Sequence, residues 1–298
     1  MWNPVEQLRL GLGRVLRSRV AGPDADAKAA QIWGAPGERW HDEGDVIWHV
    51  NSDAAMYAGG IRSLLLQALH PAAMAGVAGH SGYRSDPWGR LQRTSEFIAM
   101  TTYGPVPSAE AMIGRIRDIH ERVRGKTDDG TPYRASDPHL LAWVHIAETE
   151  SFLEGFKRYG DRRLTAAQRD EYVAQAAPVG ELLGAVDLPR TEADLAAALT
   201  AFRPELRASP AARDTVDFIL RTPPVPWPAR PGYWMLAAGA IASLPVWARQ
   251  ELGLPTGRFF DAVGNVLGKF STAVVRWGLS GPDPHRRKAM VTGVRDTP

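Results

Sequence analysis

Apolar residues recur at helical spacing along most of the chain, and this pattern predicts helices over 4–19, 60–79, 87–103, 108–124, 138–159, 166–184, 191–207, 210–221, 232–250 and 256–277. Aspartate or serine followed by proline suits a helix start, because the side-chain oxygen caps free amides and proline fixes φ. Such pairs stand at 86–87, 137–138 and 209–210. Thr165 with Gln168 forms a capping box, and Ser108 and Thr191 are further candidate starts.

Few stretches alternate between apolar and polar residues, and 45–51 is the best candidate for a short strand. The segments 125–136 and 221–232 are rich in turn residues, and the second, with five prolines, is a stiff connection and a candidate domain edge. We predict an all-α fold with a single multi-helix domain over 40–280. A basic helix and linker (1–39) precede this domain, and a polar tail (281–298) follows it.

Composition excludes several kinds of site. The 298 residues include no cysteine, which excludes disulfides and cysteine-ligated zinc, iron–sulfur or haem centres. The 35 basic and 33 acidic residues give a formal charge of +2 and are spread along the chain, so nucleic acid is not an expected partner. Ten tryptophans favour broad apolar cavities or interfaces.

Two interpretations fit the helix expected over 4–19, in which Leu8, Leu12 and Val15 share a face and arginines occupy others. It packs on the body of the protein, or it lies on a membrane surface. The longest apolar run, 233–248, is shorter than the roughly 20 residues that cross a bilayer. No secretion signal is recognisable, so we expect a cytoplasmic protein, with peripheral membrane contact through 4–19 as the open alternative.

Three histidines fall inside apolar stripes of the predicted helices. His120 lies in the stripe of 108–124, and His145 lies one turn from Glu148 in the stripe of 138–159. His70 lies in the stripe of 60–79 and precedes Pro71, where we expect a kink. Burying these polar groups requires partners for them.

A single buried histidine is typical of a satisfied core residue, whereas three on separate helices also fit a haem or metal pocket in a helical bundle. A non-haem iron site needs several carboxylates, and the one Glu-x-x-His pair, Glu38 and His41, falls in a predicted loop. Haem needs one protein ligand, an apolar slot and cations for its propionates. The sequence therefore favours haem.

A polar wall is predicted on the helix over 87–103, where Arg90, Arg93, Thr94, Phe97 and Thr101 occupy neighbouring positions. Two guanidinium groups and a hydroxyl beside an apolar face can hold propionates or stabilise negative charge on oxygen. The same spacing is also typical of a solvated helix face with arginine stems packed along it.

Three segments, 57–97, 116–125 and 133–151, resemble the catalytic domain shared by the MpaB oxygenases and the bacterial rubber oxygenases called latex clearing proteins. The resemblance covers residues 40–188. It implies an all-helical, distantly globin-like bundle that encloses haem b. It also implies oxidative cleavage of an isoprenoid carbon–carbon double bond by dioxygen.

The family's motifs assign residues by this resemblance. The distal Arg-x-x-Lys-Thr motif matches Arg90 and Thr94. The His-x-x-Val-Arg motif matches His120, which is then the proximal iron ligand, and Arg124. Arg90, Thr94, Phe97 and Arg124 are accordingly expected around the haem.

Two departures separate the chain from the rubber oxygenases. Arg93 replaces a lysine that can itself ligate iron, which leaves an open or water-bound distal position. No glutamate lies between Glu43 and Glu96, where rubber oxygenases use one. His145 stands in a Trp-Val-His motif of the broader bacterial branch; like His70, it is a candidate acid–base group, a support for the site, or a structural residue.

The leading hypothesis is a haem-dependent oxygenase that acts with dioxygen on an apolar, isoprenoid-type small molecule. In it, His120 holds iron, Arg90 and Thr94 polarise the oxygen, and Arg93 lies at the distal rim. The apolar pocket is expected to be lined by Trp88, Phe97 and Trp143. The alternatives are a haem-binding carrier or sensor without turnover, and a cofactor-free helical interaction protein. The sequence predicts neither the oligomeric state nor the exact substrate.

Overall fold

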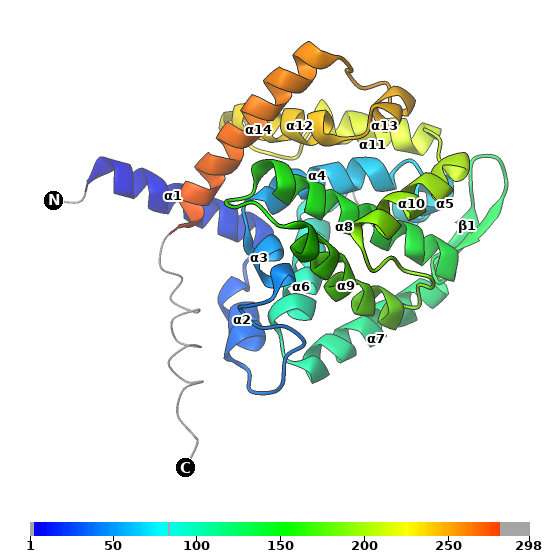
Figure 1. The fold of residues 1–298 in the computed structure, drawn as a ribbon, viewed down its shortest axis with the longest axis horizontal. Helices are drawn as coiled ribbons and strands as arrows, with labels where there is room; N and C mark the ends of the chain where they lie inside the picture. Colours follow the sequence, from blue (N-terminus) through cyan, green and yellow to red (C-terminus); the bar gives the residue numbers. More distant parts are fainter. Residues whose placement is uncertain (1–2, 83, 281–298) are drawn as a thin grey trace.

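A computed structural model describes residues 3–82 and 84–280 and shows helices almost throughout (Figure 1). The tail predicted over 281–298 lies outside the described residues. The all-α prediction is confirmed. The α-helices are α1 (Pro4–Ala21), α2 (Ala25–Ala29), α3 (Val46–Ser52), α4 (Ala55–Gln67), α5 (Pro71–His80), α6 (Pro87–Tyr103), α7 (Val106–Arg122), α8 (Pro138–Tyr159), α9 (Ala166–Leu183), α10 (Glu192–Phe202), α11 (Pro210–Leu220), α12 (Arg230–Ser243), α13 (Val246–Glu251) and α14 (Arg258–Leu279).

Short elements join some of these helices. The antiparallel strands β1 (Arg124–Lys126) and β2 (Pro132–Arg134) form a hairpin inside the connection predicted over 125–136. A π-helical turn, η1 (Ala30–Gly34), follows α2, and the 3₁₀ turns η2 (Arg203–Glu205) and η3 (Trp227–Ala229) follow α10 and precede α12.

The helices whose caps the sequence predicted begin where expected. Asp137 accepts hydrogen bonds from the amides of His139 and Leu140, and α8 begins at Pro138. Asp86 caps α6 in the same way by accepting from the Gly89 amide. Both helices coincide with the predicted ranges 138–159 and 87–103, because the side-chain oxygen and the proline act on the first turn together.

The strand predicted over 45–51 is wrong, because this segment forms α3. Val46, Ile47 and Val50 are buried on one side of that helix. In so short a segment of β-branched residues, helical and strand spacing cannot be told apart from the sequence. The Gln175 side chain accepts a hydrogen bond from the Ile47 amide at 2.9 Å and so satisfies a first-turn donor.

Prolines divide three predicted helices more completely than expected. The helix predicted over 60–79 is two helices, α4 and α5, because His70 is extended and Pro71 starts a new helix instead of kinking the first. The range 191–207 ends in η2 at Pro204, and 232–250 is broken at Pro245 into α12 and α13. A proline removes an amide donor at each break.

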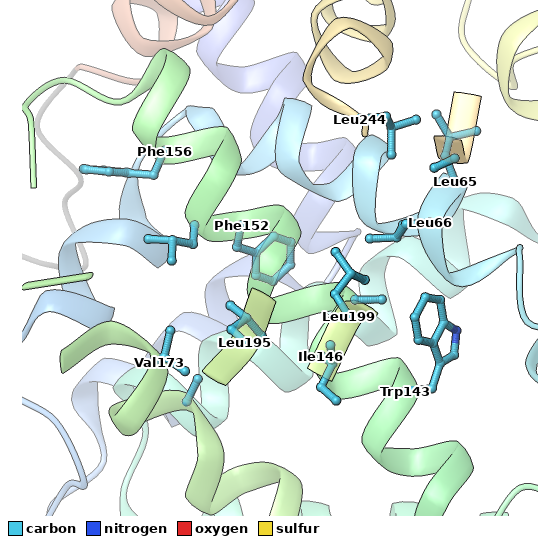
Figure 2. Close-up of a cluster of buried hydrophobic side chains, with 14 of the residues drawn as sticks. Leu65, Leu66, Trp143, Ile146, Phe152, Phe156, Val173, Leu195, Leu199 and Leu244 are labelled. Atoms are coloured by element: carbon cyan, nitrogen blue, oxygen red, sulfur yellow. The ribbon is translucent and has the colours of Figure 1, made fainter. Parts of the chain in front are cut away.

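The largest hydrophobic core surrounds α8, which packs against α4, α9, α10 and α14. Figure 2 shows part of this core, where Phe152, Ile146 and Trp143 of α8 face Leu66 of α4 and Leu195 of α10. The cluster includes residues from α3 near the N-terminus to α14 near the C-terminus. The proline-rich segment 221–232 therefore does not separate two cores, and α12 begins within it at Arg230.

None of the described helices has the length and apolar character needed to span a membrane.

Candidate functional site

The two arginines of the polar wall predicted on α6 differ in exposure and in their partners. Arg90 is half-buried, and its Nη1 donates a hydrogen bond to Ser81 Oγ at the end of α5 (2.5 Å). Arg93 is exposed and pairs with Asp86 at 3.2 Å. The wall that faces the protein therefore depends on Arg90, whereas Arg93 lies at the solvent side.

The other three members of the wall, Thr94, Phe97 and Thr101, lie further along the same helix. Thr94 is exposed and Phe97 is half-buried. Thr101 is buried and donates its hydroxyl to the Phe97 carbonyl at 2.9 Å, so it serves the helix backbone. Thr94 keeps a hydroxyl that no described residue binds, which leaves it available to a ligand.

His120 lies in the last turn of α7, and its ring is half-buried. Nδ1 is buried and has no hydrogen-bond partner among the described residues. Burial lowers the pKa of His120, against a smaller opposing effect of Glu121, so the neutral imidazole is favoured. A neutral ring without a protein partner is the state in which histidine ligates a metal.

Arg124 follows His120 at the start of β1 and is exposed. Its Nη2 donates to the Glu121 carbonyl at 3.1 Å, which satisfies one of the free carbonyls at the end of α7. The motif arginine thus lies beside the helix end that carries His120.

The C-terminal half of α5 lies between these two parts of the site. Its last residues hold Arg90 through Ser81, and the ring of Tyr133 in β2 packs against Gly76 and Gly79. Figure 1 shows α5 beside β1, and α6 also packs on α7. The end of α5 therefore contacts the beginning of α6 through Ser81 and Arg90, and the hairpin that follows His120 packs against the same half of α5.

A surface hollow of about 350 Å³ opens at this end of α5, in the connection to α6. It is lined by Ala78, Gly82, Arg84, Ser85 and Asp214. Ser81, which binds Arg90, directly precedes the lining residue Gly82 in the chain, so the hollow lies close to the arginine wall.

His70 lies at the opposite end of α5. The ten residues of α5 rise about 1.5 Å each, which separates the two ends by about 15 Å. His70 is buried, and its Nε2 lies 3.6 Å from Glu205 Oε2, while His139 Nε2 bonds to the same carboxylate at 2.9 Å. Burial lowers the pKa of His70, and Glu205 opposes this. The structure does not bring His70 beside Arg90.

His145 belongs to a third set of contacts, between α8 and α9. Its Nε2 lies 3.3 Å from Thr149 Oγ1, and a Cβ on Gly180 would stand 2.8 Å from its Nδ1. Burial, helped by Arg190, lowers the pKa of His145 to about 4. Its close packing and its lowered pKa fit the structural interpretation of His145.

Glu148, one turn further along α8, is the most perturbed carboxyl of this region. Burial raises its pKa to about 7, and its charge contributes to raising the pKa of Tyr172 on α9. A carboxyl that titrates near neutrality is suited to proton transfer. The sequence placed Glu148 on the inner face of its helix but gave no sign of this titration.

Two expectations about the site are corrected. Trp143 is fully buried and packs against Phe202, with ring centroids 5.3 Å apart, so it belongs to the core. Trp88 stacks under the Arg19 guanidinium of α1 at 5.0 Å. The two tryptophans therefore do not line one pocket with Phe97. Glu205, which joins His70 to His139, was missed because no local pattern links residues so far apart in the chain.

The comparisons agree with the motifs. The family described as ER-bound oxygenase mpaB/B'/rubber oxygenase, catalytic domain, matches residues 48–277. Neither the curated proteins nor the solved structures provide a match. The match runs from α3 to α14 and so includes the helices after residue 188, in which no motif was recognisable. The chain belongs to the catalytic-domain family of the ER-bound oxygenases mpaB/B' and the rubber oxygenases.

Proposed function

We propose that the protein is a haem b-dependent oxygenase that acts with dioxygen on an apolar, isoprenoid-type small molecule and cleaves a carbon–carbon double bond. Membership of an oxygenase family supports the reaction class. A cytoplasmic location remains part of the proposal.

The observation that carries the proposal is the state of His120. Burial lowers the pKa of its ring and so favours the neutral form, its buried Nδ1 has no partner among the described residues, and it occupies the histidine position of the family's motif. Leaving a buried ring nitrogen unsatisfied costs about 1–3 kcal/mol, which a ligand bound by the ring would offset. His120 would therefore hold haem iron through its ring, a role that fits its unsatisfied nitrogen better than that of a core residue.

The other residues of the family's motifs fit the rest of a haem group. Arg90, held by Ser81, supplies a fixed positive charge, and Thr94 supplies a free hydroxyl on the same helix. Phe97 adds an apolar surface, and Arg124 is an exposed cation for a propionate. Bound haem would supply the redox-active iron that chemistry with dioxygen needs.

The chain's own residues then have separate tasks. Arg90 stabilises negative charge that develops on oxygen, because its guanidinium is fixed before the reaction begins. Thr94 donates or accepts a hydrogen bond at the same side. Arg93, exposed and paired with Asp86, lies at the rim. His70 and His145 belong to separate contact sets, and we assign them supporting roles.

The test is an absorption spectrum of protein purified from haem-supplemented cells, recorded before and after dithionite and carbon monoxide. We expect a Soret band that is lost in His120→Ala and kept in His145→Ala, with circular dichroism showing that both variants fold. A band lost only in His145→Ala would reject His120 as the ligand. Protein without a band would reject haem, and a band without oxygen-dependent turnover of any alkene in a panel would favour a carrier or sensor.

A further inference from the structure

The helix α14 is built the opposite way from an ordinary surface helix. Its buried positions carry small residues, namely Gly264, Gly268, Ser271, Thr272, Val275 and Gly278. Four of its larger apolar side chains are exposed instead, whereas Phe260 and Leu279 pack against the core: Phe259 is 84% exposed, Val266 66%, Phe270 58% and Val263 41%. A surface helix normally buries the large apolar residues and exposes the polar ones.

Close approach to α12 explains the small inner residues. A Cβ on Gly239 of α12 would stand 2.6 Å from the Cα of Gly268, so the two backbones nearly touch. No such constraint explains the outer residues: Phe259, Val266 and Phe270 are more than half exposed, and Val263 is 41% exposed. They recur three or four residues apart, so they form one continuous apolar stripe along α14.

Charges around this stripe are positive. Arg258 and Lys269 form no ion pair with a described residue, whereas the one acidic residue of α14, Asp261, pairs with the buried Arg249. The stripe is therefore flanked by two free cations and no free anion of its own helix. An apolar stripe with cationic flanks is typical of a helix that lies in a lipid interface.

The helix α1 adds further positive charge beside α14. The two helices touch at Gly13 and Gly278, and Figure 1 shows the C-terminal end of α14 meeting α1 at the edge of the molecule. In α1, Glu6 is paired with Arg9, while Arg14, Arg17 and Arg19 form no ion pair with a described residue. Val5, Leu8 and Val15 of α1 are exposed.

We propose that the outer face of α14, assisted by the basic helix α1, binds the surface of a bilayer that contains anionic lipids. Phenylalanine and valine enter the boundary between headgroups and acyl chains, and Lys269, Arg258 and the exposed Arg14 of α1 face the lipid phosphates. A second copy of the chain fits less well, because apposed copies of this face would bring like charges together. The inference does not depend on haem or on the proposed reaction.

The experiment is co-sedimentation of the full-length protein with vesicles of pure phosphatidylcholine and of phosphatidylcholine mixed with phosphatidylglycerol. We expect binding to the mixed vesicles that weakens as salt is added. Val266→Asp and Phe270→Asp should each lower the bound fraction about tenfold, since an aspartate has to be desolvated and repelled at the interface. Lys269→Glu should weaken binding to the mixed vesicles alone.

Val186→Asp is the matched control, because Val186 is 49% exposed in the connection between α9 and α10, away from α14. It should bind as the parent does. Light scattering of each variant reports the oligomeric state in the same samples. Absence of vesicle binding, or equal loss in Val186→Asp and Val266→Asp, would overturn the proposal. A parent dimer that Val266→Asp converts to a monomer, without vesicle binding, would assign the stripe to a second copy.

Discussion

Glu148 and His145 lie one turn apart on α8, and burial shifts their pKa values in opposite directions, to about 7 and about 4. Both residues are neutral in a folded protein at a pH between these values. Their effects on stability therefore have opposite signs.

The first prediction concerns this pH dependence. The ordinary pKa of histidine is 6.5, so between pH 6.5 and about 4 the unfolded chain binds more protons at His145, and its contribution to stability rises with pH. The ordinary pKa of Glu148 is 4.5, so between pH 4.5 and about 7 the native state binds more protons there, and stability falls as pH rises. Each contribution reaches about 3 kcal/mol.

Urea unfolding across pH 4.5–8 measures both effects. We expect Glu148→Gln to be more stable than the parent above pH 7, by up to about 3 kcal/mol, and to gain stability as pH rises to 6.5. His145→Gln should lose stability with rising pH instead. Glu110→Gln, an exposed change on α7, should follow the parent. Parallel curves for all variants would contradict the burial of both groups.

The second prediction concerns the buried guanidinium of Arg62. It pairs with Glu150 of α8, bonds to Ser151 Oγ at 2.7 Å and reaches the Ser243 carbonyl of α12. Arg62→Met should lower the free energy of unfolding by about 3–5 kcal/mol, because it leaves a carboxylate without its partner in the core. Arg62→Met with Glu150→Met should recover most of this loss. Arg190→Met breaks an exposed pair and should cost about 1 kcal/mol or less.

The third prediction tests Arg124 as a haem contact. An exposed ion pair contributes about 0.2–1 kcal/mol, so Arg124→Ala should lower haem affinity by up to about fivefold in a transfer assay to apomyoglobin. Arg122→Ala, an exposed change at the last residue of α7, is the control and should keep the parent affinity. An identical effect of the two variants would remove Arg124 from the site.

The fourth prediction separates the two arginines of α6. Arg90→Ala should keep the Soret band and lower oxygen uptake with a cleavable alkene about 100-fold, since a preorganised charge is lost. Arg93→Ala should change the rate about twofold, because the side chain is exposed and already paired with Asp86. Arg115→Ala, an exposed change on α7, serves as control. Equal losses at Arg90 and Arg93 would show that both reach the reacting atoms.

Local chemistry explains which helices the sequence predicts well. The boundaries of α6 and α8 follow from Asp-Pro pairs that act within one turn. The strand prediction over 45–51 was wrong because the start of α3 depends on a residue far away in the sequence. This residue is Gln175, which lies in α9 and satisfies the Ile47 amide, so only the folded chain shows it. The prolines at 71 and 245 can be read from the sequence. Whether each one kinks a helix or separates two helices depends on how the following helix packs.

For the candidate site, too, residues in local motifs could be predicted from the sequence, whereas contacts between distant elements could not. His120, Arg90 and Thr94 stand in motifs that are local in the sequence, and the family match confirms the recognition on which their assignment rests. Their roles stay predictions. The hydrogen bond of Arg90 to Ser81 and the sharing of Glu205 by His70 and His139 depend on how α5, α8 and η2 meet, which helical periodicity does not determine.

α5 begins at Pro71, next to His70, and is followed by Ser81, which binds Arg90. The distance between these two ends determines how long a ligand must be to reach both. A molecule that touched the Arg90 wall at one end and the His70 pair at the other would have to extend about 15 Å along the helix. A compact metabolite occupies one end at a time. For the proposed isoprenoid substrate, only a chain of about this length would reach from the Arg90 wall to His70, and a series of alkenes of increasing chain length would show whether turnover changes at that length.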